Sequence, residues 1–189
     1  MTTDGAPVRP QRVDARRNYA RVVAAAHEVF TEAGPEASLN EIARRADVGP
    51  GTLYRHFPTR RALLTAVLRD RIEALCGRAD ELLSADSPDA ALADWLRAFL
   101  AHARSNQGLG GALMTAEPDE LGFDCHQRIR DAAAALLVNA QRSGTARADL
   151  SPGDLLQLVV GIALATTHVD DADQPDRLLA LVLDAVGHS

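Results

Sequence analysis

The residues best suited to chemistry lie in the stretch from Gly51 to Arg61, which reads GTLYRHFPTRR. Leu53 and Phe57 are four residues apart, so on a helix they share one face and can enter a small core. The other faces carry side chains that hydrogen-bond to phosphates and base edges: Thr52, Tyr54, Arg55 and His56. Gly51 has no side chain, so a base or phosphate can approach the backbone closely there.

The sequence before this stretch predicts a helix-turn-helix. Ser38 and Glu41 match the S-x-x-E capping box and predict the start of a short helix. After the tight connector 47–51, Pro50 fits the first turn of the next helix because proline has no amide hydrogen to lose there. Two short helices joined by about four residues place the second helix in the DNA major groove. The spacing alone leaves an ordinary solvated surface as the alternative.

Charge is divided unevenly along the 189 residues. Residues 1–71 contain twelve Arg and eight acidic residues, a net charge of +4, whereas residues 72–189 contain eight Arg and eighteen acidic residues, a net charge of −10. Every one of the 20 Lys or Arg positions is Arg, which binds phosphate and guanine in a fixed two-pronged geometry. The front part is therefore expected to contact a polyanion and the rear part to serve another role.

Hydrophobic residues recur at helical spacing throughout, which predicts an all-α fold. Gly34-Pro35 is expected to end a first helix, and Thr59 to cap a long fourth helix after Pro58. Further starts are expected at Ser87-Pro88, near Asp119, at Ser151 and at Pro175, with a helix break at residues 108–111. We predict a flexible N-terminal arm (1–12), a three-helix helix-turn-helix DNA-binding domain (13–58) and a helical effector-binding and dimerisation domain (59–189).

The motif resembles the DNA-binding signature of TetR-type bacterial transcriptional regulators. The resemblance covers about residues 15–70 and rests on these positions: Ile42, Ala43, Val48, Gly51, Thr52, Leu53, Tyr54, His56, Phe57, Arg60, Leu63 and Leu64. It implies a homodimer that binds a palindromic DNA operator and acts as a repressor. It also implies phosphate or base contacts for Thr52, Tyr54 and His56, and phosphate contacts for Ser38 and Arg60. The lack of an apolar leader in residues 1–11 and of a bilayer-spanning stretch predicts a cytoplasmic protein.

Two positions depart from that family's pattern. Asp47 stands in the turn where the family usually has Gly, and Gly49 stands where a Ser or Thr usually caps the recognition helix. Asp tolerates left-handed backbone better than most residues, and Gly is an acceptable N-cap, so both changes are expected to preserve the fold. Phosphate contacts at the start of the helix are where a difference is expected.

The rear half faintly resembles SbtR-like members, and the family resemblance implies that it binds a small-molecule effector and forms the dimer. The effector candidates lie on apolar stripes with polar tips: Trp95, Phe99, His102, Leu113, Met114, Phe123, His126 and His168. The last two helices are apolar around most of their circumference, so a second copy is expected to cover them. The expected interface residues are Leu155, Val159, Ile162, Leu178, Val182 and Val186; the alternative is that both helices belong to the core.

Several other functions are disfavoured. Cys76 and Cys125 form no C-x-x-C motif, and no His or Cys spacing typical of a metal site occurs. No apolar stretch is long enough to span a bilayer. We therefore predict no metal, no cofactor, no membrane partner and no enzyme activity; the competing hypotheses are an all-α enzyme that carries the helix-turn-helix as an addition, and a constitutive architectural DNA-binding protein.

Overall fold

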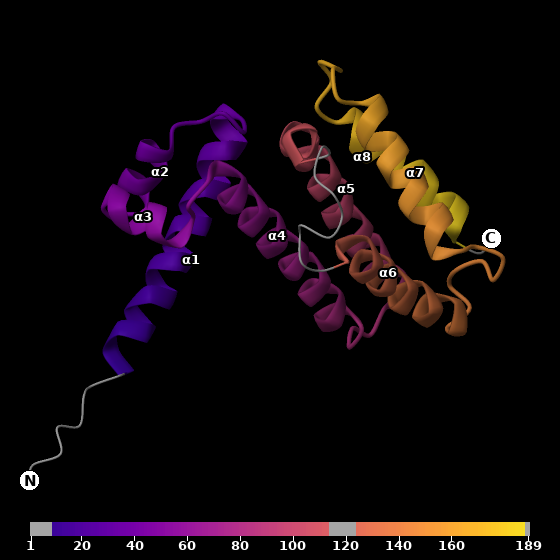
Figure 1. Ribbon diagram of the computed structural model, residues 1–189. Coiled ribbons are helices and arrows are strands. Elements are labelled where there is room, and N and C mark those ends of the chain that lie inside the picture. The colour runs from indigo at the N-terminus through magenta and orange to yellow at the C-terminus, as the bar shows by residue number, and fades with distance from the viewer. Residues whose placement is uncertain (1–8, 114–123, 188–189) are drawn as a thin grey trace, which may run out of the picture. The chain divides into compact units, whose positions relative to one another are not determined.

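The computed structural model describes residues 9–113 and 124–187, and in this part of the chain every regular element is an α-helix (Figure 1). This confirms the predicted fold class. The helices are α1 (Arg9–Ala33), α2 (Leu39–Arg45), α3 (Pro50–His56), α4 (Arg60–Leu82), α5 (Pro88–Leu113), α6 (Cys125–Arg142), α7 (Pro152–Ala165) and α8 (Gln174–Val186). None of the described helices is long and apolar enough to cross a membrane.

The chain divides into two compact units, Met1–Val67 (unit 1) and Leu68–Ser189 (unit 2). The boundary lies inside α4, whereas the sequence placed it just before that helix. At the other end, α1 already begins at Arg9, so the last residues of the expected arm are helical. Each unit has a core of its own and is described by itself.

Unit 1 is a three-helix unit that also includes the first turns of α4. α1 packs on α2, and α2 on α3. Gly34, with φ of 79°, ends α1 in the left-handed conformation that glycine adopts without strain. The core is apolar and contains side chains from all four helices, each less than 4% exposed: Val22, Val23, Ala26, Phe30, Ile42, Leu53, Phe57, Leu63 and Val67. The predicted division of α3 into an inward face and an outward face is confirmed.

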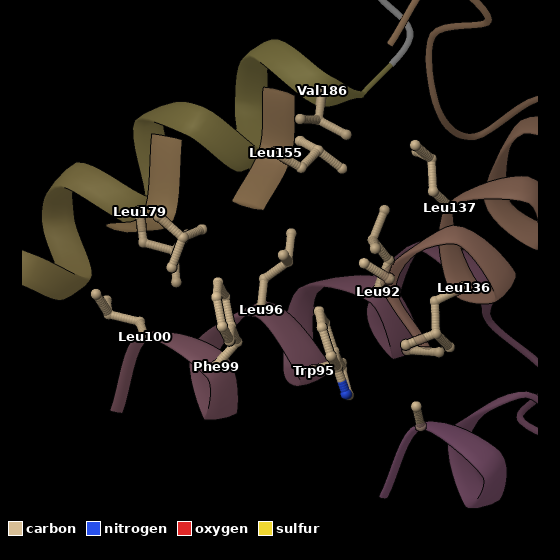
Figure 2. Close-up of a cluster of buried hydrophobic side chains, with 14 of the residues drawn as sticks. Leu92, Trp95, Leu96, Phe99, Leu100, Leu136, Leu137, Leu155, Leu179 and Val186 are labelled. Carbon is tan, nitrogen blue, oxygen red and sulfur yellow. The ribbon is translucent and has the colours of Figure 1, made fainter. Parts of the chain in front are cut away.

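Unit 2 is built around α5, which packs against α6, α7 and α8. Trp95 lies fully buried in the core, and its indole Nε1–H donates a 3.0 Å hydrogen bond to the Leu75 carbonyl of α4 (Figure 2). The same core contains leucines from five helices, α4 to α8, among them Leu92, Leu136 and Leu155. The core thus buries an indole without leaving its polar group unsatisfied.

Two of the expected helix caps are confirmed by side-chain hydrogen bonds to backbone amides. Ser151 and Asp154 form a complete capping box at α7, with the Ser151 hydroxyl accepting from the Asp154 amide. Thr59 Oγ1 accepts a hydrogen bond from the Ala62 amide at the start of α4.

Three local predictions are wrong. Ser38 is the N-cap of α2, as predicted, but its side chain makes no cap bond, and the Glu41 carboxylate accepts hydrogen bonds from Arg44 and Arg45. α5 continues through Gly108–Gly111 to Leu113, since glycine weakens a helix by about 1 kcal/mol but does not forbid it as proline does. α6 begins at Cys125, after the expected start, where Asp124 caps the Gln127 amide.

Candidate functional site

α3 presents a polar face of four side chains next to a buried one. Leu53 and Phe57 are 1% and 3% exposed, whereas Tyr54 is 48% exposed. Arg55 is also exposed, and its guanidinium lies 3.4 Å from the half-buried Thr52 hydroxyl. A Cβ added to Gly51 would meet nothing within 4 Å. The packing of unit 1 therefore does not require a glycine there, although glycine weakens the helix.

The turn between α2 and α3 is closed from α1. Asp47 adopts a φ of 49°, a left-handed conformation that Asp tolerates better than most residues do. The Arg21 guanidinium donates to the Asp47 carbonyl and, over 2.8 Å, to its carboxylate. The second departure, Gly49, is the N-cap of α3 in extended conformation. Both departures leave the helix-turn-helix intact.

His56 is half-buried and not fully exposed, because it packs against Tyr19. The sequence did not predict this contact. The Tyr19 ring of α1 lies edge-on to His56 at 6.2 Å between centroids and 5.0 Å from Phe57. Tyr19 is itself 41% exposed. It thus links α1 to the carboxyl end of α3, and its signal in the sequence is an aromatic residue at the edge of the apolar stripe of α1.

Arg60 lies at the start of α4 as predicted, but its guanidinium is engaged within unit 1. Nη1 donates to the Pro35 carbonyl over 2.8 Å and also to the Ala37 carbonyl. These two carbonyls belong to the connection between α1 and α2. Arg60 therefore holds that connection, which positions the exposed Ser38 next to it.

The arginines of α2 are neutralised by nearby carboxylates. Arg44 pairs with Glu41 at 2.6 Å, and Arg45 pairs with both Glu32 of α1 and Glu41. Hydrogen bonds from Arg44 and Arg45 lower the pKa of Glu41 to about 2. Three other arginines of unit 1 make no ion pair with any described residue: Arg16, Arg17 and Arg55. The uncompensated positive charge thus includes one side chain on α3 itself.

The expected effector residues fall into three groups. Trp95, Phe99 and His102 come together: the Trp95 and Phe99 rings are 5.6 Å apart at 7°, and the Phe99 and His102 rings 6.4 Å apart at 21°. His126 and His168 are exposed instead of facing the core. The remaining candidates lie outside the described side chains: Leu113, Met114 and Phe123.

Most of the expected dimer residues are core residues of a single protomer. Leu155, Val159, Ile162 and Val186 are at most 9% exposed, packed in the core of unit 2, while Leu178 and Val182 are half-buried at its edge. The prediction failed because helices that are apolar all round do not reveal which side faces inward. The exposed apolar side chains of α7 and α8 are instead Leu158 (48%), Val160 (38%), Leu164 (63%) and Leu181 (65%).

Cys76 and Cys125, far apart in the sequence, belong to one small buried cluster with Ile72. Burial raises the pKa of both thiols. Among the described residues, no three His, Cys, Asp or Glu side chains gather in a way that could hold a metal ion.

Two family models match the two units. The model for bacterial regulatory proteins of the tetR family matches residues 22–67, and the model for the SbtR-like transcriptional regulator C-terminal domain matches residues 87–188, which is more than half of the chain. The chain belongs to the TetR family. The resemblance of the motif around Gly51 and that of the rear half are thereby confirmed at the level of the family.

Solved structures of other proteins are similar over most of the chain. The crystal structure of a TetR transcriptional regulator from Streptomyces coelicolor is 38% identical, with a TM-score of 0.80, and the similarity covers 90% of this chain and 98% of that one. The structure of a gamma-butyrolactone receptor, described as ArpA-like, is 25% identical with a TM-score of 0.56, covering 89% of this chain and 85% of that one.

Curated relatives are similar over a shorter stretch of the chain. An HTH-type transcriptional regulator of Staphylococcus aureus (strain USA300) is 42% identical over 59 residues, which are 31% of this chain and 32% of that protein. The match thus spans about a third of the relative's length.

Proposed function

We propose that this TetR-family regulator is a homodimeric repressor that binds a palindromic operator through α3 and is released by a small molecule bound in unit 2. The observation that carries the DNA-binding part is the outward face of α3, where Tyr54 and Arg55 are exposed next to a glycine in open space. The open space beside Gly51 lets a DNA backbone approach α3 closely there.

The sharpest test changes Gly51 without disturbing the fold. Gly51→Ala adds a methyl group into open space, so unit 1 should stay folded, while the methyl group blocks the approach of DNA. Binding to the DNA upstream of the protein's own gene, measured by fluorescence anisotropy, is expected to weaken at least about tenfold, which corresponds to about 1.4 kcal/mol. Gly77→Ala, the same change at another open helical position, is the matched control and should bind as the parent does.

A second measurement separates phosphate contacts from other effects. The logarithm of operator affinity should fall linearly with the logarithm of salt concentration, because bound phosphates release their counterions. Arg55→Ala is expected to make that negative slope shallower by about 1. Arg142 is an exposed arginine at the end of α6, and Arg142→Ala should leave the slope unchanged. Equal slopes for the two variants would contradict the role of Arg55.

The dimer is supported by the exposed apolar side chains of α7 and α8. Leu164 and Leu181 leave about two thirds of their surface in water, and a second copy packed as a four-helix arrangement would cover such side chains. A palindromic operator requires two reading heads related by a two-fold axis. Leu181→Glu should therefore convert the dimer to a monomer in sedimentation analysis, and Leu83→Glu, at an exposed leucine just after α4, should not.

The effector response is supported by the similar receptor structure and by the clustering of Phe99 and His102 near the core of unit 2. α4 runs from unit 1 into unit 2, so a ligand that favours another arrangement of α4 changes the separation of the two reading heads from about 34 Å. Operator affinity should then fall in the presence of the effector. Equal affinity with and without every small molecule that raises the melting temperature would refute this step.

A further inference from the structure

We propose that Tyr19 of α1 is a positioning residue for DNA binding: its ring holds the imidazole of His56, at the carboxyl end of α3, in the orientation from which it contacts the operator. This inference rests on the proposed binding of DNA through α3, and it adds a side chain from outside the two helices of the motif. It concerns three rings of unit 1, those of Tyr19, His56 and Phe57.

The three rings form one group. The Tyr19 centroid lies 5.0 Å from that of Phe57 and 6.2 Å from that of His56, and the His56 and Phe57 centroids are 6.3 Å apart. Phe57 is 3% exposed, so the core of unit 1 fixes it and gives Tyr19 a rigid support. The plane of the Tyr19 ring is at 77° to that of His56. An edge-to-face pair at this separation is an arrangement that aromatic rings favour.

His56 is placed where its own helix restrains it little. It is the last residue of α3, and the chain leaves the helix at Phe57, with φ of −131° and ψ of 86°. The imidazole N–H can donate a hydrogen bond to a phosphate or a base edge. A side chain that is immobilised only on binding costs conformational entropy. A ring that Tyr19 and Phe57 already hold avoids most of that cost before DNA arrives.

The core of unit 1 does not by itself explain an aromatic ring at position 19. Residues 13–21 of α1 include no buried side chain, and Val22 is the first buried residue of the helix. Tyr19 is 41% exposed, so its apolar contribution is the cover that it gives to Phe57. A leucine supplies similar cover, but it has no ring to pack edge-on against an imidazole. This difference separates positioning of His56 from simple packing.

The test compares ring, hydroxyl and apolar bulk at position 19 of the full chain. Affinity for the DNA upstream of the protein's own gene is measured by fluorescence anisotropy. Tyr19→Phe keeps the ring and should retain the affinity, whereas Tyr19→Leu keeps only apolar bulk and should bind about fivefold more weakly. In the His56→Ala chain, Tyr19→Leu should change the affinity less than about 1.5-fold, because the side chain that it positions is gone. Val13→Ala, at a 48% exposed position of the same helix, is the matched control and should bind as the parent does.

A second measurement reports on His56 without DNA. Three-bond scalar couplings of the isotope-labelled histidine side chain show whether χ1 occupies one rotamer or several. One rotamer is expected in the parent and in Tyr19→Phe, and averaging between rotamers in Tyr19→Leu. If Tyr19→Leu does not fold, Tyr19→Met takes its place in both measurements, because methionine is apolar, flexible and a good helix former.

Each outcome has a definite meaning. The inference is overturned if Tyr19→Leu binds DNA as the parent does, or if its loss is equally large in the His56→Ala chain, which would show an effect on folding alone. It is also overturned if Tyr19→Phe loses as much affinity as Tyr19→Leu, since the hydroxyl and not the ring would then be responsible, or if the His56 couplings are the same in all chains. If the parent binds no DNA, the proposed repressor fails, and the couplings alone decide whether Tyr19 holds His56.

Discussion

The two units are stabilised by different means. In unit 1, α2 and α3 have only seven residues each, too short to persist alone, and side-chain bonds on the surface fix them: Arg45 joins α2 to α1, Arg21 joins the turn to α1, and Arg60 joins α4 to the α1–α2 connection. In unit 2, longer helices share one apolar core centred on α5. Unit 1 thus adds polar bonds at the edges of its short helices to a small core, whereas unit 2 depends chiefly on packing.

The strongest test of this contrast is to empty the core of unit 2. Trp95→Ala removes a fully buried indole and leaves the Leu75 carbonyl without its donor. The expected loss is about 3–5 kcal/mol in the free energy of unfolding, measured by urea denaturation. Val138→Ala, at a 39% exposed position on α6, should change it by less than about 0.5 kcal/mol. A loss below 2 kcal/mol at Trp95 would show that packing does not dominate unit 2.

The corresponding test in unit 1 removes a polar bond. Arg60→Met keeps the apolar stem but loses both hydrogen bonds to the Pro35 and Ala37 carbonyls, so unit 1 should lose about 1.5–3 kcal/mol. Native-state hydrogen exchange reports this locally: the amides of α2 and α3 should lose protection while those of α6 keep theirs. Arg17→Met, an exposed arginine of α1, should leave both sets unchanged. Equal exchange in all three proteins would mean that the Arg60 bonds do not stabilise the domain.

The same contrast explains what the sequence could predict. The helix-turn-helix was recognisable because a few residues have fixed tasks: Gly34 ends α1, Pro50 opens α3, and Leu53 and Phe57 must enter the core. Contacts between residues far apart in the sequence leave no such pattern. The hydrogen bonds of Arg60 and the ring contacts of Tyr19 were therefore not predicted.

The rear half was harder to interpret because its apolar residues are interchangeable in the sequence. Leu155 and Leu164 look alike on α7, yet one is fully buried and the other 63% exposed, since the packing of α5, α6 and α8 decides which side of α7 faces inward. The effector candidates met the same difficulty: Phe99 and His102 come together on α5, whereas His126 and His168 lie exposed.

Asp47 allows a finer test of unit 1, at a single backbone position. Asp47→Ala should destabilise unit 1 by about 1 kcal/mol, because alanine is strained at a φ of 49° and has no side-chain acceptor for Arg21. Asp47→Gly loses the same acceptor but relieves the backbone, so its melting temperature should be at or above that of Asp47→Ala by a few degrees. If alanine proved the more stable of the two, the conformation of this turn would not limit the stability of the domain.

The smallest expected effect concerns the ion pairs on the surface of unit 1, and it depends on pH. Glu41 has a folded pKa of about 2 against 4.5 for the free group, because Arg44 and Arg45 donate hydrogen bonds to its carboxylate. A lowered pKa contributes stability that is present above pH 4.5 and is lost as the pH falls towards 2. Glu41→Gln should therefore lower the melting temperature slightly at pH 7, and by progressively less between pH 4.5 and 2.

The size of that difference discriminates between two descriptions of unit 1. Exposed ion pairs stabilise a protein weakly, since water and salt screen them. Glu28→Gln, which removes another exposed carboxylate from α1, gives the background. If Glu41→Gln matches Glu28→Gln at every pH, then Arg44 and Arg45 do not stabilise α2 through Glu41, and the hydrogen bonds of Arg60 and Arg21 would have to hold the helix-turn-helix without them.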